Sequence, residues 1–226
     1  MERPTGMFLE KVAVRIPSQK VWLEGELSVP EGATDMVLFA HGSGSSRHSP
    51  RNQYVAQTLQ QAGLGTLLMD LLTPEEERLD QITGEYRFDI DRLARRLADA
   101  TRWLQEDLET HRFQIHYFGA STGAAAALFA AARLPAEIKS VVSRGGRPDL
   151  AQVVLPQVKA ATLLIVGGDD YPVVQFNQAA YERLQCEKQL VSIPGATHLF
   201  EEPGALEEVA RLASDWFLKH GKKIAD

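Results

Sequence analysis

A serine in a short glycine-flanked turn carries the clearest chemical signal in the sequence. Residues 115–123 read IHYFGASTG, and a run of small and apolar residues follows. G-x-S-x-G between a strand and a helix is the pattern of a nucleophile elbow, in which a tight turn presents the Ser121 hydroxyl above the carboxyl end of a sheet. The N–H groups that open the helix would face any developing negative charge. A serine that only caps a helix is the competing interpretation.

A serine nucleophile needs a base, which in this architecture comes last in the chain order Ser, Asp or Glu, His. His198 and His220 are the histidines that follow Ser121. His220 lies in the charged segment KHGKK and is expected in solvent, whereas His198 follows a predicted strand in the loop IPGATH. We therefore expect His198 to be the base.

Two adjacent aspartates are candidates for the acid that orients this base. The segment 164–173 reads LIVGGDDYPV, so Asp169 and Asp170 both follow a buried apolar run. The spacing G-x-x-D-x-x-V through Gly167, Asp170 and Val173 favours Asp170 as the acid. Asp169 remains the alternative, and the other aspartate would cap the following helix.

A second glycine-rich loop is placed to stabilise an oxyanion. Residues 39–46 read FAHGSGSS, in which a predicted strand ends in the loop. We expect the backbone N–H groups of Ser43 and Thr122 to form the oxyanion hole. A phosphate-binding loop is the rival interpretation, but neither G-x-x-x-x-G-K-[ST] nor G-x-G-x-x-G is present.

Four arginines follow strands at the same predicted sheet edge. Arg47 and Arg51 come after the oxyanion loop, and Arg144 and Arg147 come after another predicted strand. Against a net charge of −6, they are candidates for binding a substrate carboxylate or phosphate. Structural ion pairing with acids such as Asp149 is the alternative.

The elements needed to position these residues follow from hydrophobic patterning. Alternation over 11–17 and 20–30 predicts an antiparallel hairpin. Short apolar runs then alternate with helical patterns, which predicts an α/β fold with a doubly wound, mostly parallel sheet and antiparallel N-terminal strands. The predicted later strands are 36–40, 66–69, 115–118, 140–143, 162–166 and 189–193, and the predicted helices are 52–63, 89–108, 121–134, 172–184 and 204–220.

The connections between these elements are expected to leave the site open. Residues 71–86, LLTPEEERLDQITGEY, are interpreted as an acidic, irregular surface loop without a function. The span 144–162 is too short for a large lid. A length of 226 residues fits one domain, 1–226.

Composition excludes several classes of protein. The chain has 44% hydrophobic and 24% charged residues, which is ordinary for a globular protein, and its acidic balance argues against nucleic-acid binding. Cys186 is the single cysteine, so an intramolecular disulfide and a CxxC metal site are impossible. Residues 1–9 lack a signal-peptide core, and the apolar stretch 119–132 is too short to span a bilayer. A cytoplasmic protein that does not bind membranes is expected, whereas its oligomeric state does not follow from the sequence.

The chain resembles the α/β-hydrolase superfamily over essentially its whole length, and most closely the small, lidless dienelactone-hydrolase-like group. The matching segments are HGSGSS at 41–46, GASTG at 119–123, SRGGRPDLA at 143–151, GGDD at 167–170 and GATHLFEEPGAL at 195–206. Dienelactone hydrolases proper have a cysteine in the elbow, where this chain has Ser121.

The resemblance implies hydrolysis of an ester-type bond in a small molecule, with no metal or organic cofactor. Ser121, Asp170 and His198 would form the catalytic triad, and an acyl-enzyme would be the intermediate. A thioesterase, peptidase or perhydrolase on the same fold is an alternative. A non-catalytic binding protein is a further alternative, although such proteins usually lose a triad member.

Overall fold

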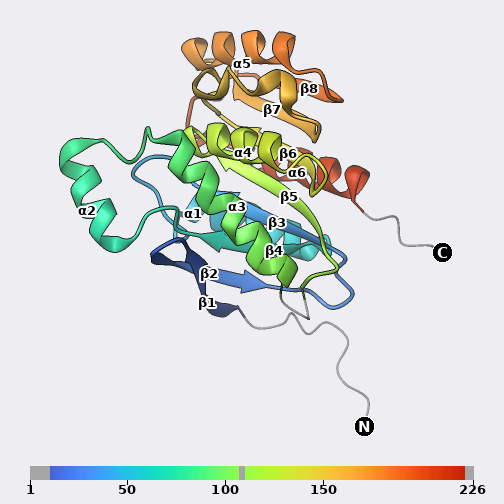
Figure 1. Ribbon diagram of the computed structural model, residues 1–226. Helices are drawn as coiled ribbons and strands as arrows, with labels where there is room; N and C mark the ends of the chain where they lie inside the picture. Colours follow the sequence, from blue (N-terminus) through green and yellow to red (C-terminus); the bar gives the residue numbers. More distant parts are fainter. Residues whose placement is uncertain (1–10, 107–109, 222–226) are drawn as a thin grey trace.

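One sheet runs through the middle of the molecule in the computed structural model, which describes residues 11–106 and 110–221 (Figure 1). Eight strands lie in the order β1-β2-β4-β3-β5-β6-β7-β8. Their bounds are β1 Val12–Ser18, β2 Val21–Ser28, β3 Asp35–Ala40, β4 Gly65–Met69, β5 Gln114–Ala120, β6 Ile138–Arg144, β7 Ala161–Gly167 and β8 Lys188–Ile193. Residues 1–9, in which we found no signal-peptide pattern, lie outside the described residues.

Strand directions agree with the predicted mostly parallel sheet. β1 pairs with β2, and β2 with β4, in antiparallel fashion, whereas every pair from β4 to β8 is parallel. The register aligns Ala40 with Gly119, Ala120 with Arg144, and Gly167 with Ile193. The segments that leave these parallel strands therefore meet at one edge of the sheet, as expected for an α/β ligand site.

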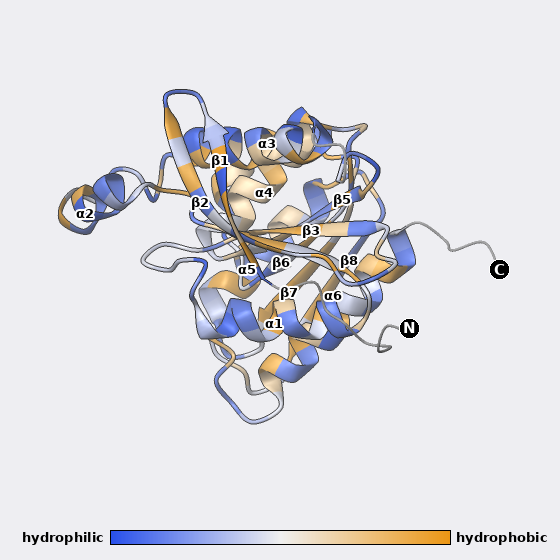
Figure 2. Ribbon diagram, turned by 90° about the horizontal axis from the view of Figure 1, so that it is seen from below, coloured by the Kyte–Doolittle hydropathy of each residue, from blue (hydrophilic) through white to orange (hydrophobic). Residues whose placement is uncertain are grey.

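Helices cover both faces of the sheet (Figure 2). One face packs against α1 Pro50–Gln61 and α6 Ala205–His220. The opposite face packs against α3 Ile90–Glu106, α4 Thr122–Arg133 and α5 Tyr171–Arg183. The predicted doubly wound arrangement is confirmed, with helix ends that differ from the expected ones by a few residues.

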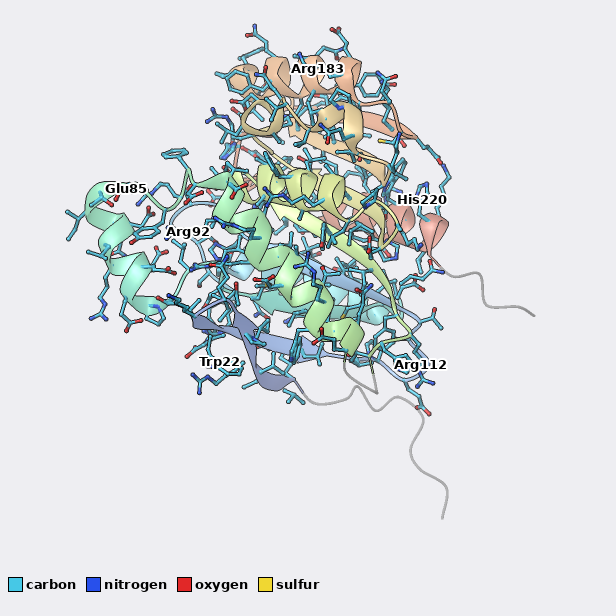
Figure 3. All side chains as sticks on the ribbon, viewed as in Figure 1. Trp22, Glu85, Arg92, Arg112, Arg183 and His220 are labelled. Carbon is cyan, nitrogen blue, oxygen red and sulfur yellow. The ribbon has the colours of Figure 1, made fainter. Side chains whose placement is uncertain are left out.

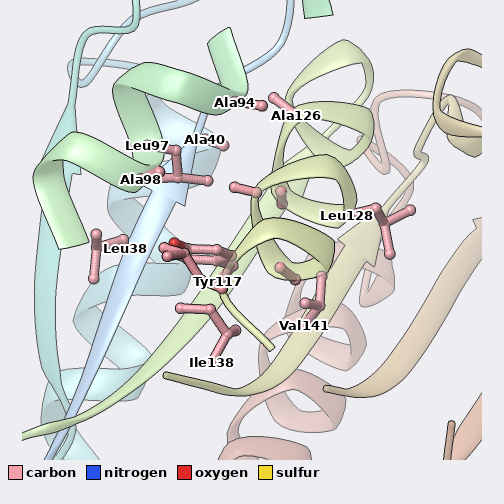
Figure 4. Packing of buried hydrophobic residues seen from close by; sticks show 14 of the residues in the cluster. Leu38, Ala40, Ala94, Leu97, Ala98, Tyr117, Ala126, Leu128, Ile138 and Val141 are labelled. Atoms are coloured by element: carbon pink, nitrogen blue, oxygen red, sulfur yellow. The ribbon is translucent and has the colours of Figure 1, made fainter. Parts of the chain in front are cut away.

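Alternation within the buried strands divides the core in two. In β3, Val37 and Phe39 face α1 and α6, whereas Met36 and Leu38 face the layer of α3 and α4. Figure 4 shows Leu38 and Tyr117 packed beneath that layer. The hydroxyl of Tyr117 lies 2.6 Å from that of Thr101, so this buried phenol has a hydrogen-bond partner.

The expected irregular loop at 71–86 is wrong, because α2 Pro74–Thr83 occupies most of it. Thr73 and Glu76 form a capping box: the Glu76 N–H donates to Thr73 Oγ1 at 3.3 Å, and the Thr73 N–H donates to Glu76 Oε2 at 2.9 Å. Pro74 opens the first turn, and Gly84 ends the helix in the left-handed conformation with φ 68°. These end signals determine a helix whose hydrophobic periodicity is weak.

Two partly buried ion pairs hold α2, which projects from the body of the molecule (Figures 1 and 2). Arg96 of α3 donates to both carboxylate oxygens of Glu76 at 2.6 Å and to the Leu71 carbonyl at 2.7 Å. Asp80 accepts from Arg87 Nε at 2.7 Å. Arg92, which lies near the start of α3, also faces Glu76 at 3.6 Å (Figure 3).

The connection from β6 to β7 contains two short 3-10 helices, Pro148–Ala151 and Leu155–Gln157, and no larger covering element. The prediction that no large lid lies there is confirmed. Over the residues that are described, none of the helices has the length and apolar character needed to cross a membrane.

Candidate active site

Ser121 lies on a strained turn between β5 and α4. Its backbone has φ 51° and ψ −121°, a conformation that non-glycine residues seldom adopt. The two glycines of the motif permit this turn because each lies so close to neighbouring backbone that no side chain would fit. A Cβ at Gly119 would lie 2.5 Å from Ala124 Cα, and a Cβ at Gly123 would overlap the Ala40 carbonyl oxygen. The geometry is that of a nucleophile elbow.

His198 and Asp170 are joined by a short hydrogen bond. His198 Nδ1 lies 2.6 Å from Asp170 Oδ2, so the imidazole donates to the carboxylate through Nδ1 and keeps Nε2 for another partner. The Asp170 side chain is 14% exposed, whereas that of His198 is 41% exposed. Asp169 is exposed and supports the loop through its backbone N–H, which donates to Ala196 at 3.0 Å. The structure therefore brings Asp170 to the histidine.

The loop that carries His198 is fixed on both sides. The Thr197 hydroxyl donates to Glu202 Oε1 at 2.6 Å, and the Thr197 N–H donates to the same oxygen at 3.1 Å. These hydrogen bonds lower the pKa of the Glu202 carboxyl. Gly167, at the end of β7, lies against the carbonyl of Ala196, where a Cβ would come within 2.5 Å. This contact sets the spacing between the loop of Asp170 and the loop of His198.

Ser121 and His198 line the same pocket, which has a volume of about 160 Å³. Within the described part of the chain, no hydrogen bond joins the two side chains. Such contacts are often loose before substrate binds. The other residues around the pocket come from five segments and are Gly42, Ser43, Ser45, Ser49, Arg51, Ala120, Arg144 and Leu199.

The predicted oxyanion loop packs directly against the elbow. A Cβ at Gly42 would lie 2.9 Å from Ser121 Cβ, so the loop comes as close as glycine allows. The Ser43 N–H donates to the Thr122 hydroxyl at 3.1 Å, and the two hydroxyls also lie 3.1 Å apart. The predicted donor at Ser43 is therefore beside the elbow but is engaged by Thr122.

His41 has a structural position at the base of this loop. Its Nε2 accepts from the Leu71 N–H at 2.9 Å, and its Nδ1 donates to the Gly42 carbonyl at 2.9 Å. Burial lowers the pKa of the imidazole, which keeps it neutral and preserves both contacts. His41 thereby ties the oxyanion loop to the segment after β4.

The four arginines separate into two pairs. Arg47 binds the carboxylates of Asp70 and Glu24, and Arg147 binds Asp149 with contacts of 2.7 and 2.9 Å. Neither lines the pocket of Ser121, whereas Arg51 and Arg144 do.

A second Ser–His–Asp set lies at the opposite edge of the sheet. His116 Nδ1 is 2.8 Å from Ser140 Oγ, and its Nε2 is 3.0 Å from Asp35 Oδ1. All three residues are buried. Burial lowers the pKa of His116, although the hydrogen bond to Asp35 opposes the shift. This set joins the first halves of β3, β5 and β6 and is a structural contact.

Sequence reasoning missed three residues that line the pocket, Ser45, Ser49 and Leu199. Leu199 has a detectable signal, since it directly follows the predicted base. The serines do not, because their approach depends on how the loop folds back from β3 to α1. Across the described ranges, no group of three or more His, Cys, Asp or Glu side chains is arranged to hold a metal ion.

Comparisons with known proteins agree with this fold. A dienelactone hydrolase from Anabaena variabilis ATCC 29413 has a crystal structure with a TM-score of 0.93, 59% identity, and coverage of 94% of this chain and 99% of that one. Est1E from Butyrivibrio proteoclasticus shares the fold, with a TM-score of 0.77 and 16% identity over 92% of this chain and 98% of its own.

A curated relative from Mycobacterium tuberculosis is named a putative phosphoribosyl transferase. It is 55% identical over 207 residues, which are 92% of this chain and 46% of the relative. The chain thus spans about half the length of the curated relatives that it matches.

The family model that matches is that of the dienelactone hydrolase family, and it covers residues 42–219. The matched span begins in the oxyanion loop and includes Ser121, Asp170 and His198. The chain therefore belongs to the dienelactone hydrolase family.

Proposed function

We propose that this protein is a serine hydrolase that cleaves an ester-type bond in a small molecule through an acyl-enzyme. The observation that carries the proposal is the strained Ser121 in one pocket with His198, whose Nδ1 lies 2.6 Å from Asp170. Membership in the family supports hydrolysis as the reaction class. The pocket that Ser121 and His198 share supports attack of Ser121 on a substrate placed beside His198.

In the proposed reaction, His198 Nε2 accepts the proton of Ser121 as the hydroxyl oxygen attacks the carbonyl carbon. Asp170 holds the imidazole in the required tautomer and stabilises its charged form. The protonated His198 then donates the proton to the leaving alkoxide, and the acyl group remains on Ser121. Water attacks the acyl-enzyme with the same base, which releases the acid and restores Ser121.

The oxyanion would be bound by the N–H groups of Thr122 and Ser43. Thr122 opens α4, so its N–H has no partner one turn earlier in the helix. The Ser43 N–H must exchange the Thr122 hydroxyl for the oxyanion. Rotation of the Thr122 side chain would free the Ser43 N–H, and the Thr122 hydroxyl already has a second partner in the Ser43 hydroxyl at 3.1 Å.

The curated relatives' name does not decide the activity of this chain, which matches less than half of their length. Hydrolysis of an ester, a thioester or a peptide passes through the same type of tetrahedral intermediate, so the proposed triad does not distinguish these substrates. A panel of p-nitrophenyl esters, acyl thioesters and short peptides distinguishes these substrates through kcat/KM.

Labelling with a fluorophosphonate probe tests the proposal, because such a probe reacts with an activated serine. The parent protein should be labelled once per chain, at Ser121. Ser121→Ala should remain folded, lose labelling and lose about 10⁴–10⁶-fold in ester turnover. Ser45→Ala removes another serine of the same pocket and should keep the labelling. Ester turnover within tenfold of the parent in Ser121→Ala would exclude Ser121 as the nucleophile.

A further inference from the structure

A buried arginine with unpaired nitrogen atoms lies beside the proposed nucleophile. Arg144 is the last residue of β6 and is 8% exposed. Its backbone carbonyl accepts the Ser121 N–H at 3.2 Å, so it is directly linked to the elbow. Its Nε and Nη1 atoms are buried and have no hydrogen-bond partner among the described residues. The guanidinium does contact the ring of Phe200, with its Cζ atom 5.8 Å from the ring centroid.

The neighbouring charge in the pocket is also positive. Arg51 of α1 lines this pocket, and its buried Nε has no partner, although its Nη1 donates to Glu201 at 3.0 Å. Burial and the Arg51 charge lower the pKa of the Arg144 guanidinium to about 10. Arg144 therefore stays charged at neutral pH.

This arrangement is unfavourable in the protein alone. A buried charge is normally paired, and a guanidinium cannot avoid the penalty by losing its proton near neutral pH. Arg47 and Arg147 show how the chain satisfies other arginines, since each binds a carboxylate of the protein. Among the residues that the structure describes, no carboxylate pairs with Arg144 in this way, and Arg144 is one of the residues that line the pocket of Ser121.

We infer that Arg144 and Arg51 form an anion subsite, which binds a carboxylate or phosphate group carried by the substrate. The inference rests on the proposed function, because it assigns the charge of the molecule that Ser121 attacks. A guanidinium donates to the oxygens of either anion in a fixed geometry. The pocket of about 160 Å³ is small, so the anionic group and the scissile bond must belong to a short compound.

Anion binding is first measured without turnover, in the Ser121→Ala protein. Calorimetry with inorganic phosphate and with propionate gives a Kd for each class of anion. Arg144→Met should raise the Kd of the preferred anion about ten- to a hundredfold, because a charge-assisted hydrogen bond is lost. Arg51→Met should raise it less, since Arg51 retains a protein partner. Arg211→Met, at an exposed arginine of α6, removes the same charge elsewhere and should leave the Kd unchanged.

Thermal unfolding gives a second readout. Arg144→Met should raise the Tm in anion-free buffer, because it removes an unpaired buried charge, and should abolish the increase in Tm that the anion produces. If neither anion binds the parent, or if Arg144→Met and Arg51→Met both bind it as the parent does, the inference is wrong.

Matched esters connect binding to catalysis. We compare a p-nitrophenyl ester that ends in a carboxylate, one that ends in a phosphate, and a neutral ester of equal length. The parent should prefer one anionic ester in kcat/KM, and Arg144→Met should reduce this preference about ten- to a hundredfold. Arg211→Met should keep both this preference and the turnover of the neutral ester at the values of the parent.

The outcomes separate the inference from the proposed function. If the parent protein binds the anion but is not labelled by the fluorophosphonate, the serine mechanism is excluded and the anion subsite is kept. Normal labelling of Ser121 with no ester preference and no anion binding would exclude the anion subsite alone.

Discussion

At Ser121 the chain adopts a backbone conformation of a kind that costs about 1–3 kcal/mol for a non-glycine residue. The close contacts of Gly119 and Gly123 with neighbouring backbone hold the turn in place and offset this strain. The strain fixes the side chain of Ser121 at the start of α4, toward the pocket shared with His198. Glycine is therefore required at positions 119 and 123 for the turn to place the Ser121 hydroxyl beside the pocket.

The two adjacent aspartates make a matched pair for mutation. Asp170→Asn should reduce ester turnover about 10⁴-fold, because the amide cannot stabilise the charged imidazole and favours the wrong tautomer. Asp169→Asn should leave turnover within about tenfold, since that side chain is exposed and the loop contact of Asp169 comes from its backbone. Steady-state kcat/KM with one p-nitrophenyl ester measures both variants. The reverse order of losses would transfer the role of the acid to Asp169.

Residue types and spacing were sufficient to predict which side chains the structure brings together only where one local segment contains the signal. The elbow and the His198 loop each follow a recognisable strand, and G-x-x-D-x-x-V distinguished Asp170 from Asp169. The four arginines could not be separated in this way. Arg47 pairs with Asp70 and Glu24, which lie far from it in the chain, and only the folded arrangement reveals such partners.

At the scale of elements, the strands were predicted well because each is a short apolar run with few alternatives. α2 was missed because its apolar residues do not form a clear stripe. Leu79 and Ile82 are 50% and 85% exposed, so burial contributes little to this helix. Its ends contribute more, through the capping box of Thr73 and Glu76 and through the left-handed Gly84. The end signals were present in the sequence, in TPEE and in the glycine ten residues after the proline.

The contribution of this cap can be measured. Thr73→Ala removes the acceptor of the Glu76 N–H and should destabilise α2 by about 1 kcal/mol. Amide hydrogen exchange should become about fivefold faster over 74–83, while the amides of α4 keep the protection of the parent. Thr83→Ala is the control, since Thr83 lies on the same helix at its other end. Equal protection of 74–83 in Thr73→Ala and the parent would show that Arg96 and Arg87 hold α2 without the cap.

At the scale of the whole molecule, two buried histidines connect stability to pH. Burial lowers the pKa of His41 and of His116, so both are neutral in the folded protein. In the unfolded chain each binds a proton near pH 6.5. The stability that depends on their neutral form is therefore complete above that pH and is lost as the pH falls below it. Each proton steepens the decline by up to about 1.4 kcal/mol per pH unit.

Urea unfolding between about pH 5 and pH 8 checks this dependence. His116→Gln should have a lower free energy of unfolding at neutral pH, because it disrupts the contacts with Asp35 and Ser140. It should also have a shallower decline at acidic pH than the parent, since one buried group no longer takes up a proton on unfolding. His48→Gln, at an exposed histidine, should retain the slope of the parent. An unchanged slope in His116→Gln would contradict the inference that His116 is neutral in the folded protein and takes up a proton on unfolding.

The contact among Ser140, His116 and Asp35 has a consequence for how active sites are recognised. The described residues contain two Ser–His–Asp sets, one at each edge of the sheet. They use the imidazole differently, because His116 contacts Asp35 through Nε2 whereas His198 contacts Asp170 through Nδ1. Both have a histidine within hydrogen-bond distance of an aspartate. Solvent access distinguishes them, because His116 is fully buried whereas the side chain of His198 is 41% exposed. One domain thus contains the same three residue types twice, once as a contact between buried strands and once beside the pocket where we propose that they react.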